Sequence, residues 1–247
     1  MIVLFALVMA RVFGLFLGAP IFSTQRVMPR RIRMMLAALI APALMPAAMS
    51  DQLPQDGFAV TVAIVGELAI GFAIGLLTRF VFAAFQIAGT IMGYQMGLAM
   101  ANVIDPESNR QVGVLGTLHV TMIAVMFLLV DGHHMLIRGL ATSFEAFPVG
   151  GVLQTGVLAQ AVFASGGSMW EAGARIAAPV TGIMLLINGM LGLINRVMPQ
   201  MSIFNIGFPL SAFAGYMAVL LTIPESASFF VRAYARVELD IARLVGG

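Results

Sequence analysis

The stretch ANVIDPESNRQVGVLG (Ala101–Gly116) is a polar island in an apolar part of the chain. The long apolar run Phe58–Ile104 leads into it, and a second run, Val112–Val130, follows it. Hydrocarbon offers no partners to the backbone N–H and C=O groups of an irregular loop, so such a loop must face water or protein. Such a loop is allowed where it lines an aqueous lumen. The residues of this candidate loop, to which the family resemblance given below assigns a plug or gating role, are Asp105, Pro106, Glu107, Ser108, Asn109, Arg110, Gln111 and Gly113.

A second interpretation of the same stretch is local. Asp105 fits the N-cap of a helix, Pro106 its first position and Glu107 its first turn. The two interpretations are compatible, because a helix can begin at the edge of a loop that lines a passage. Gly113 and Gly116 would let such a loop move.

Composition indicates an integral membrane protein, or a subunit buried among similar subunits. Of its 247 residues, 60% are hydrophobic and 10% are charged, whereas soluble domains average about 45–50% apolar and about 25% charged. Cysteine is absent, which excludes disulfides, thiolate metal ligands and cysteine nucleophiles. All 13 basic residues are arginine, and no basic patch with interleaved aromatics predicts a nucleic-acid partner. No nucleophile elbow, phosphate loop or catalytic carboxylate pair is found, so neither an enzyme nor a cofactor is expected.

The predicted fold class is all-α, a polytopic helical membrane protein, because no dyad alternation of a barrel is visible. Met1–Phe22 is expected to be a retained helix, since Arg11 interrupts its apolar run and no basic leader precedes it. Met34–Met49 is short for a span and is broken by two prolines. Phe58–Ile104 is too long for one simple span. Either Arg79 separates two helices, or the run is a long helix or hairpin packed in an assembly.

An arginine cluster follows the first helix within one expected loop. Such clusters are held on the cytoplasmic side during insertion, so its predicted role is topology. A site for anionic lipid or for a partner is the alternative. The cluster consists of Arg26, Arg30, Arg31 and Arg33.

The second half of the chain carries amphipathic patterns. The first of two apolar stripes, at residues 136–147, indicates an amphipathic segment that either lies on a surface or packs into the protein. Arg175–Asn195 is a clear helix candidate, a segment broken by proline follows it, and Leu210–Ile223 is the last apolar run. The final stretch predicts an amphipathic helix facing lipid headgroups or a partner. The two stripes are Leu136, Leu140, Phe144 and Phe147, and then Phe230, Tyr234, Val237, Ile241 and Leu244.

Glycines recur every fourth residue in several runs. Small residues at this spacing let helix backbones approach closely inside a membrane protein. They are Gly89, Gly93 and Gly97, with Gly71/Gly75 and Gly14/Gly18. Beside the first set run Met92, Met96 and Met100. These methionines are interpreted either as a flexible seal or as ordinary core filling.

Five charged residues lie in or beside apolar runs: Arg11, Glu67, Arg79, Glu171 and Arg175. A charge at the middle of a membrane costs about 2.5–3.5 kcal/mol on insertion scales, so these residues must face partners, water or each other. Pairing is favoured over a proton or ion pathway, since Glu171 and Arg175 are spaced for an i, i+4 pair. His133 and His134 beside Asp131 are interpreted as a helix boundary. No metal site is expected there.

Several segments together resemble the FliR/SctT family, membrane components of the type III export apparatus. They occur in the family's order along nearly the whole chain, and DGHHMLIRGL and the NIGFP segment look closer to the flagellar branch. The segments are RVFGLFLGAPIFSTQRVMPRRIRMMLAALIAPAL, GELAIGFAIG, QIAGTIMGYQMGLAMANVIDPES, FLLVDGHHMLIRGLATSFEAFPVG and PQMSIFNIGFPL.

The resemblance implies a fold, partners and a role. One such subunit assembles with several copies each of FliP and FliQ, beside FlhB and other components, into a helical gate for unfolded substrates. That gate lies at the bacterial inner membrane, in the flagellar basal body. A FliP-like portion, residues 1–165, would precede a FliQ-like hairpin with an amphipathic end, residues 166–247, and the loop at Ala101–Leu115 would protrude into the channel and help close it. A stand-alone secondary transporter of a small solute, or a purely structural scaffold, are the alternatives.

Overall fold

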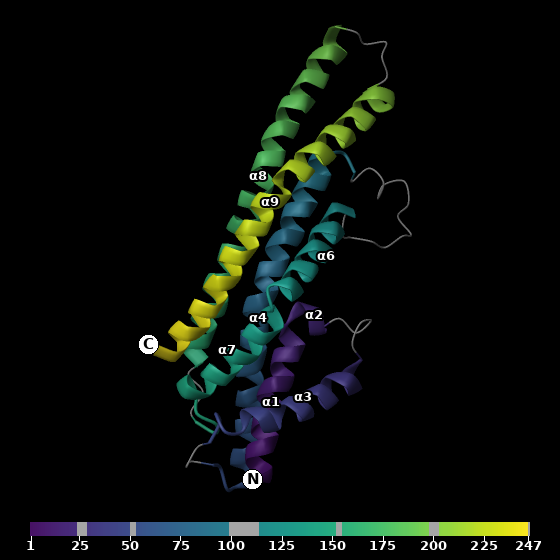
Figure 1. The fold of residues 1–247 in the computed structure, drawn as a ribbon. Helices are drawn as coiled ribbons and strands as arrows, with labels where there is room; N and C mark the ends of the chain where they lie inside the picture. The colour runs from purple at the N-terminus through teal and green to yellow at the C-terminus, as the bar shows by residue number, and fades with distance from the viewer. Residues whose placement is uncertain (24–28, 50–52, 99–113, 152–154, 198–202, 247) are drawn as a thin grey trace. The chain divides into compact units, whose positions relative to one another are not determined.

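The computed structural model describes residues 1–23, 29–49, 53–98, 114–151, 155–197 and 203–246, and within these ranges it contains helices and no strand. This confirms the predicted all-α class. In chain order (Figure 1) the helices are α1 (Ile2–Gly18), α2 (Pro20–Ser23), α3 (Arg30–Leu44), α4 (Gly57–Gln95), α6 (Val114–Leu129), α7 (Gly132–Ala146), α8 (Thr155–Val197) and α9 (Ile203–Gly246).

Among the described residues, three helical stretches are long and apolar enough to cross a membrane. They are Gly57–Gln95, Leu158–Val197 and Gly207–Ala235, and α6 with α7 would make a fourth if that bent pair forms one span. The predicted polytopic membrane protein is therefore supported by the lengths of these helices.

The chain divides into two compact units, and the long helices α4, α8 and α9 contribute to both. The first unit comprises Met1–Val81, Phe127–Gly167 and Arg232–Gly247, and the second comprises Phe82–Met126 and Ser168–Val231. The proposed division of the sequence near residue 165 is a separate matter and stays a prediction.

In the first unit, α1 packs against α3 and against the beginning of α4. The stripe predicted on α7 is buried: Leu136, Leu140 and Phe144 are 2%, 1% and 4% exposed, so the packed alternative is confirmed. Asp131 adopts a left-handed conformation with φ 54° and separates α6 from α7. The DGHH segment is thus a helix boundary, as predicted.

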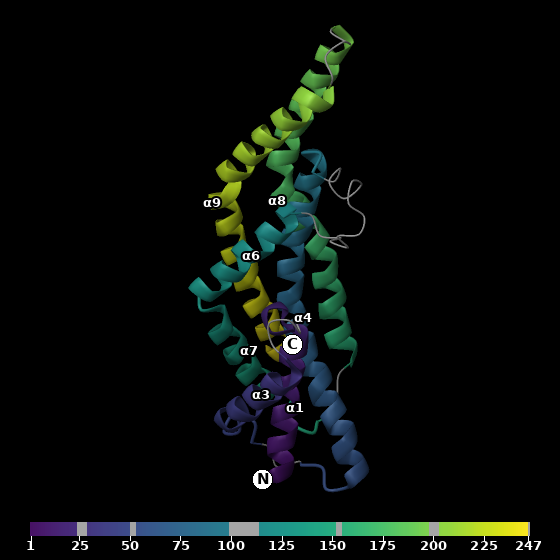
Figure 2. The ribbon, with the colours of Figure 1, turned by 90° about the vertical axis from the view of Figure 1, so that its right-hand side faces the viewer.

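In the second unit, aromatic rings join α4 to α9. The Phe85 ring centroid lies 6.2 Å from that of Phe229 and 6.0 Å from that of Phe230, in edge-on geometry. Helices α8 and α9 lie side by side near the connection 198–202 in both views (Figures 1 and 2). There the Ser211 hydroxyl donates a hydrogen bond to Asn188 Oδ1 at 3.4 Å. The two helices thus pack against each other here, and the FliQ-like hairpin of residues 166–247 stays a prediction.

The structure decides between the two interpretations of the run Phe58–Ile104. Helix α4 continues through Arg79, so the long helix is confirmed and a break at Arg79 is wrong, because a single exposed arginine is a good helix former and does not end a helix. The segment expected to be broken by proline is helical from Ile203 onward, through Pro209, so a break at Pro209 was wrong; long apolar helices tolerate proline when neighbours satisfy the freed backbone groups. The arginines expected in a loop instead occupy the first turn of α3; they are Arg30, Arg31 and Arg33.

Candidate functional site

The central polar segment, Asp105–Gly113, lies outside the described residues, as do Met100 and Arg26. The residues that flank the segment are described. Leu98 precedes it at the end of α4, and Val114 follows it at the start of α6. What the structure shows of this site is therefore how the end of α4 and the start of α6 are packed.

The end of α4 is closed by a Schellman motif. Gly97 N–H donates to the Tyr94 carbonyl at 3.1 Å, and Leu98 N–H donates to the Gly93 carbonyl at 3.0 Å. Gly97 has φ 76°, a left-handed conformation that glycine adopts at little cost. Gly97 thus lies past the end of the helix as its cap, and does not belong to a helix face with Gly89 and Gly93.

The start of α6 is pressed against α4 at Gly89. A Cβ atom on Gly89 would lie 2.6 Å from the Leu115 carbonyl oxygen and 2.7 Å from Gly116 Cα. The two backbones therefore touch, and only glycine fits there. Both flanks of the central segment are thus fixed within the second unit.

The α8–α9 hairpin also contacts the end of α4. Met96 is fully buried, and its Sδ would lie 2.8 Å from a Cβ atom on Gly215 of α9. The Asn188 side chain of α8 donates a hydrogen bond to the Gln95 carbonyl at 3.3 Å, which is one of the carbonyls left open at a helix end. Helices α8 and α9 thus pack against the end of α4, which directly precedes the central segment.

Met92 and Met96 are both 0% exposed. Side chains buried in the unit fill its core, so for these two methionines packing accounts for their position. A sealing role for the methionine row stays a prediction, because Met100 is not described.

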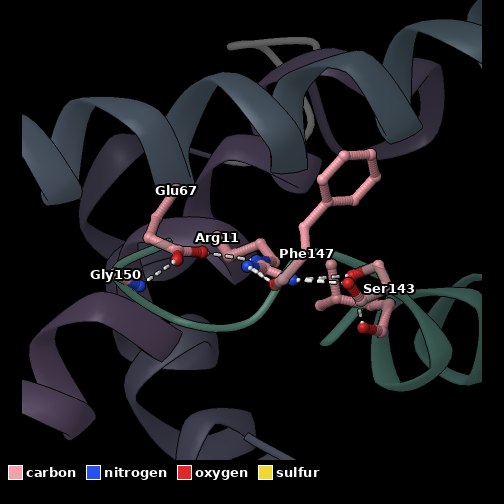
Figure 3. Close-up of polar contacts among 6 residues, drawn as sticks. Arg11, Glu67, Ser143, Phe147 and Gly150 are labelled. Carbon is pink, nitrogen blue, oxygen red and sulfur yellow. Dashed lines mark hydrogen bonds and ion pairs between the residues drawn. The ribbon is translucent and has the colours of Figure 1, made fainter. Parts of the chain in front are cut away.

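A second cluster surrounds the buried guanidinium of Arg11 in the first unit (Figure 3). Arg11 Nε donates to Glu67 Oε2 at 2.5 Å, and the two residues are 0% and 3% exposed. Arg11 Nη1 donates to the carbonyl and hydroxyl oxygens of Ser143 at 3.0 and 3.1 Å. Arg11 Nη2 donates to the Phe147 carbonyl at 2.7 Å. The other Glu67 oxygen accepts from Gly150 N–H at 3.3 Å.

The surroundings of the guanidinium complete this arrangement. The Arg11 Cζ atom lies 4.1 Å from the centroid of the Phe144 ring, a cation–π contact. Figure 3 shows the Phe147 ring turned away from the guanidinium, so that only its carbonyl takes part. One side chain of α1 thus ties together α4, α7 and the turn after α7.

A fully hydrogen-bonded and charge-paired cluster of this kind orients helices, since removing either partner would leave an uncompensated buried charge. All its oxygen and nitrogen partners lie within the protein. The geometry fixes α1, α4 and α7 relative to one another within the first unit.

Helices α1 and α4 also cross with their backbones in contact. A Cβ atom on Gly18 would lie 2.5 Å from the Phe72 carbonyl oxygen, and one on Gly75 would lie 2.9 Å from Gly18 Cα. Cβ atoms on Gly14 or Gly71 would meet the partner helix backbone as well. The predicted glycine pairs therefore lie at one close crossing.

Of the remaining charged candidates, all but Arg33 lie on the surface in the described part of the chain. Arg79 is exposed, and Arg175 Nη2 donates to Glu171 Oε1 at 2.6 Å in an exposed i, i+4 pair. On α3, Arg30 and Arg31 are exposed and Arg33 is buried. None of these residues joins the Arg11 cluster.

One group of potential metal ligands is present in the described part of the chain. Ligand atoms of Asp131, His133 and His134 lie within 4.8 Å of one another. The side chains of His134 and Asp131 are 62% and 73% exposed and form a 3.4 Å contact. Exposed groups on one turn offer little preorganisation, so their established role in this structure is the boundary between α6 and α7.

The sequence did not point to the partners of Arg11 on α7 and in the following turn. Ser143, Phe147 and Gly150 bind mostly through backbone atoms, which carry no residue-type signal. The only signal was the pair of charges in apolar runs, Arg11 and Glu67, and their separation of 56 positions gave no means to pair them.

Comparison with known proteins places these features in a family. The model of the family described as bacterial export proteins, family 1, matches residues 2–237. The chain is 34% identical to flagellar biosynthetic protein FliR of Escherichia coli K12 over 227 residues, which cover 92% of this chain and 87% of that protein. It is 32% identical to FliR of Pectobacterium carotovorum, covering 92% and 87% of the two chains. With FliR of Bacillus subtilis it shares 32% identity, covering 67% and 64%.

These relatives confirm the resemblance drawn from the sequence motifs, and the match of the family model extends over nearly all of the described helices. The chain therefore belongs to family 1 of the bacterial export proteins.

Proposed function

We propose that the chain is a membrane subunit of the flagellar type III export gate, where it acts without enzymatic chemistry. One observation carries the proposal: the export-family model matches residues 2–237, and relatives named flagellar biosynthetic protein FliR align over most of their length. The three helices able to span a membrane agree with it.

In this proposal the chain forms part of a protein-conducting channel across the inner membrane. Unfolded flagellar subunits pass through it, driven by the proton motive force and by an associated ATPase elsewhere. Asp105–Gly113 closes the resting channel as a plug. Support comes from the polarity of this segment between two apolar runs and from the fixed ends of α4 and α6 on either side of it.

Partners are FliP and FliQ, in several copies around one copy of this chain, together with FlhB. The hairpin of the second unit supports this, because many of its large apolar side chains are exposed and call for lipid or protein around them. They include Leu185, Leu186, Met190, Leu193, Phe213 and Leu221. The proposed FliQ-like hairpin, residues 166–247, contains all six.

Co-purification tests the assembly. A tagged chain is extracted from its own bacterium in mild detergent and its companions are identified by mass spectrometry. The proposal expects FliP and FliQ in excess over the chain, with little stable chain when they are absent. A monomer or homodimer that is stable alone would contradict it and would fit a small-solute transporter.

A leak assay tests the plug. Deleting Asp105–Gln111 should leave the complex assembled and make the membrane permeable to small ions. The control is the variant Glu171→Ala/Arg175→Ala, which alters only an exposed surface pair and should leave the membrane tight. If the deletion variant assembles and its membrane stays tight, the segment does not close the channel.

A further inference from the structure

Helix α3 has two unlike faces. Its buried residues share one helix face, which packs against the rest of the first unit. They are Arg33, Ala37, Ala41 and Leu44. On the opposite side, Ile32, Met35 and Leu39 are 45%, 72% and 74% exposed. These exposed positions follow an i, i+3, i+7 spacing, which places them on one stripe.

The charges of α3 are gathered at one end of that stripe. Arg30 and Arg31 are exposed in the first turn, and the helix contains no acidic residue. Arg31, Met35 and Leu39 stand in an i, i+4, i+8 row, so a cation continues the apolar row. In the described part of the chain, neither Arg30 nor Arg31 makes an ion pair.

These arginines do not serve the stability of the helix itself. A helix N-terminus carries partial positive charge, so cations in the first turn are unfavourable there. An outside anion would relieve this repulsion. The apolar stripe beside them requires an apolar environment at the same time.

The length of α3 excludes a span. Its 15 residues extend about 22 Å at about 1.5 Å per residue, less than the roughly 30 Å hydrocarbon core. A short helix with an apolar face and exposed arginines is the pattern of a helix that lies in the plane of a membrane surface. The chain's own spanning helices bring a bilayer within reach.

We propose that the exposed face of α3 lies on the membrane surface, with Ile32, Met35 and Leu39 among the acyl chains and Arg30 and Arg31 on anionic phospholipid headgroups. The arginine cluster then serves as a lipid-binding element as well as a topology signal. This inference rests on the membrane location and is independent of protein export. It survives if the plug does not close a channel.

Photocrosslinking in the cell membrane tests the surface with the full chain in its own assembly. A photoreactive benzoylphenylalanine replaces Met35, and after illumination the tagged chain is isolated and its adducts are weighed. The expected adduct is a phospholipid, with phosphatidylglycerol and cardiolipin enriched over their share of the membrane. A protein adduct of defined mass would show that a partner subunit covers the face and would overturn the proposal.

Matched variants test the headgroup contact. Arg30→Gln/Arg31→Gln is expected to lower the yield of anionic-lipid adduct at position 35 by about tenfold, whereas Arg30→Lys/Arg31→Lys should retain most of it. Both arginines are exposed, so these changes leave the packing of α3 intact. The same probe at Val65, an exposed position on the spanning helix α4, controls for insertion and should give equal adducts in all variants. If anionic phospholipid makes up the same fraction of the adducts at position 35 with and without the change Arg30→Gln/Arg31→Gln, the proposal is overturned.

Discussion

At the scale of single residues, Arg11 is the strictest constraint in the first unit. Its guanidinium is fully buried and donates to a carboxylate, a hydroxyl and two carbonyls. A buried charge with this many partners contributes chiefly by fixing geometry, because the desolvation of both ions offsets much of their attraction. Losing one partner of Arg11 therefore lowers the free energy of unfolding, even though forming the whole set of contacts adds little net stability.

Removing one charge from this pair should therefore destabilise the protein strongly. We expect Arg11→Met or Glu67→Gln to lower the unfolding free energy by roughly 3–5 kcal/mol. Arg11→Met should have the larger effect, since it also leaves the carbonyls of Ser143 and Phe147 without donors. Thermal unfolding of the detergent-solubilised complex measures both variants.

The exposed pair Glu171–Arg175 provides the control. Arg175→Met removes an i, i+4 surface pair, which contributes only about 0.3–0.5 kcal/mol. If Glu67→Gln shifts the unfolding midpoint no more than Arg175→Met does, the buried pair does not hold the helices. If Glu67→Gln stops ion or substrate passage in an intact complex, the charge pathway becomes the better account.

Gly97 and Gly93 test the cap beside the central segment. Gly97→Ala places a side chain in a left-handed conformation and should lower stability by about 1–2 kcal/mol. Gly93→Ala, on the same helix, has as its nearest neighbour the Leu115 Cβ at 3.9 Å, and should be neutral or slightly stabilising. Equal effects of the two changes, measured by thermal unfolding, would contradict the assignment of Gly97 as the cap.

Part of this residue-scale picture followed from sequence. Charges in apolar runs were expected to face partners, water or each other, and glycines spaced by four were expected at close helix contacts; Arg11–Glu67 and the Gly18–Gly75 crossing meet these expectations. The partners themselves did not follow. Ser143 and Phe147 accept through their backbone carbonyls, and any residue type has a carbonyl.

At the scale of elements, the crossing of α1 and α4 depends on glycine at the contact. Gly75→Ala should push the helices apart and lower stability, because its Cβ would lie 2.5 Å from the Leu15 carbonyl oxygen. Gly66→Ala lies on the same helix with nothing within 4 Å, and should raise stability by up to about 1 kcal/mol through helix propensity. If thermal unfolding shows a lower stability for Gly75→Ala and a higher one for Gly66→Ala, the close crossing of α1 and α4 is supported. A loss of stability in both variants would contradict it.

Element boundaries show where sequence reasoning stops. The break at Asp131 was predicted because the DGHH run is polar and carries glycine. Helices α4 and α9 continue through Arg79 and Pro209, where a local signal for a break was overridden. The packing of the surrounding helix decides such cases, and that packing is a property of the folded chain.

At the scale of the whole molecule, the proposed function relates the helices of the second unit to the central segment. The described anchors, Gly89 against Leu115, the cap at Gly97 and Met96 against Gly215, hold both ends of a polar segment within one unit. The proposal places that segment in the path of exported chains.

Crosslinking to a stalled substrate tests that placement most directly. A photoreactive residue replaces Asn109, and a flagellar subunit fused to a domain that cannot unfold is arrested during export. The account predicts an adduct between the chain and the arrested substrate, which disappears when export is not started. An assembled complex with an arrested substrate and no adduct from position 109 would contradict the claim that this segment lines the passage.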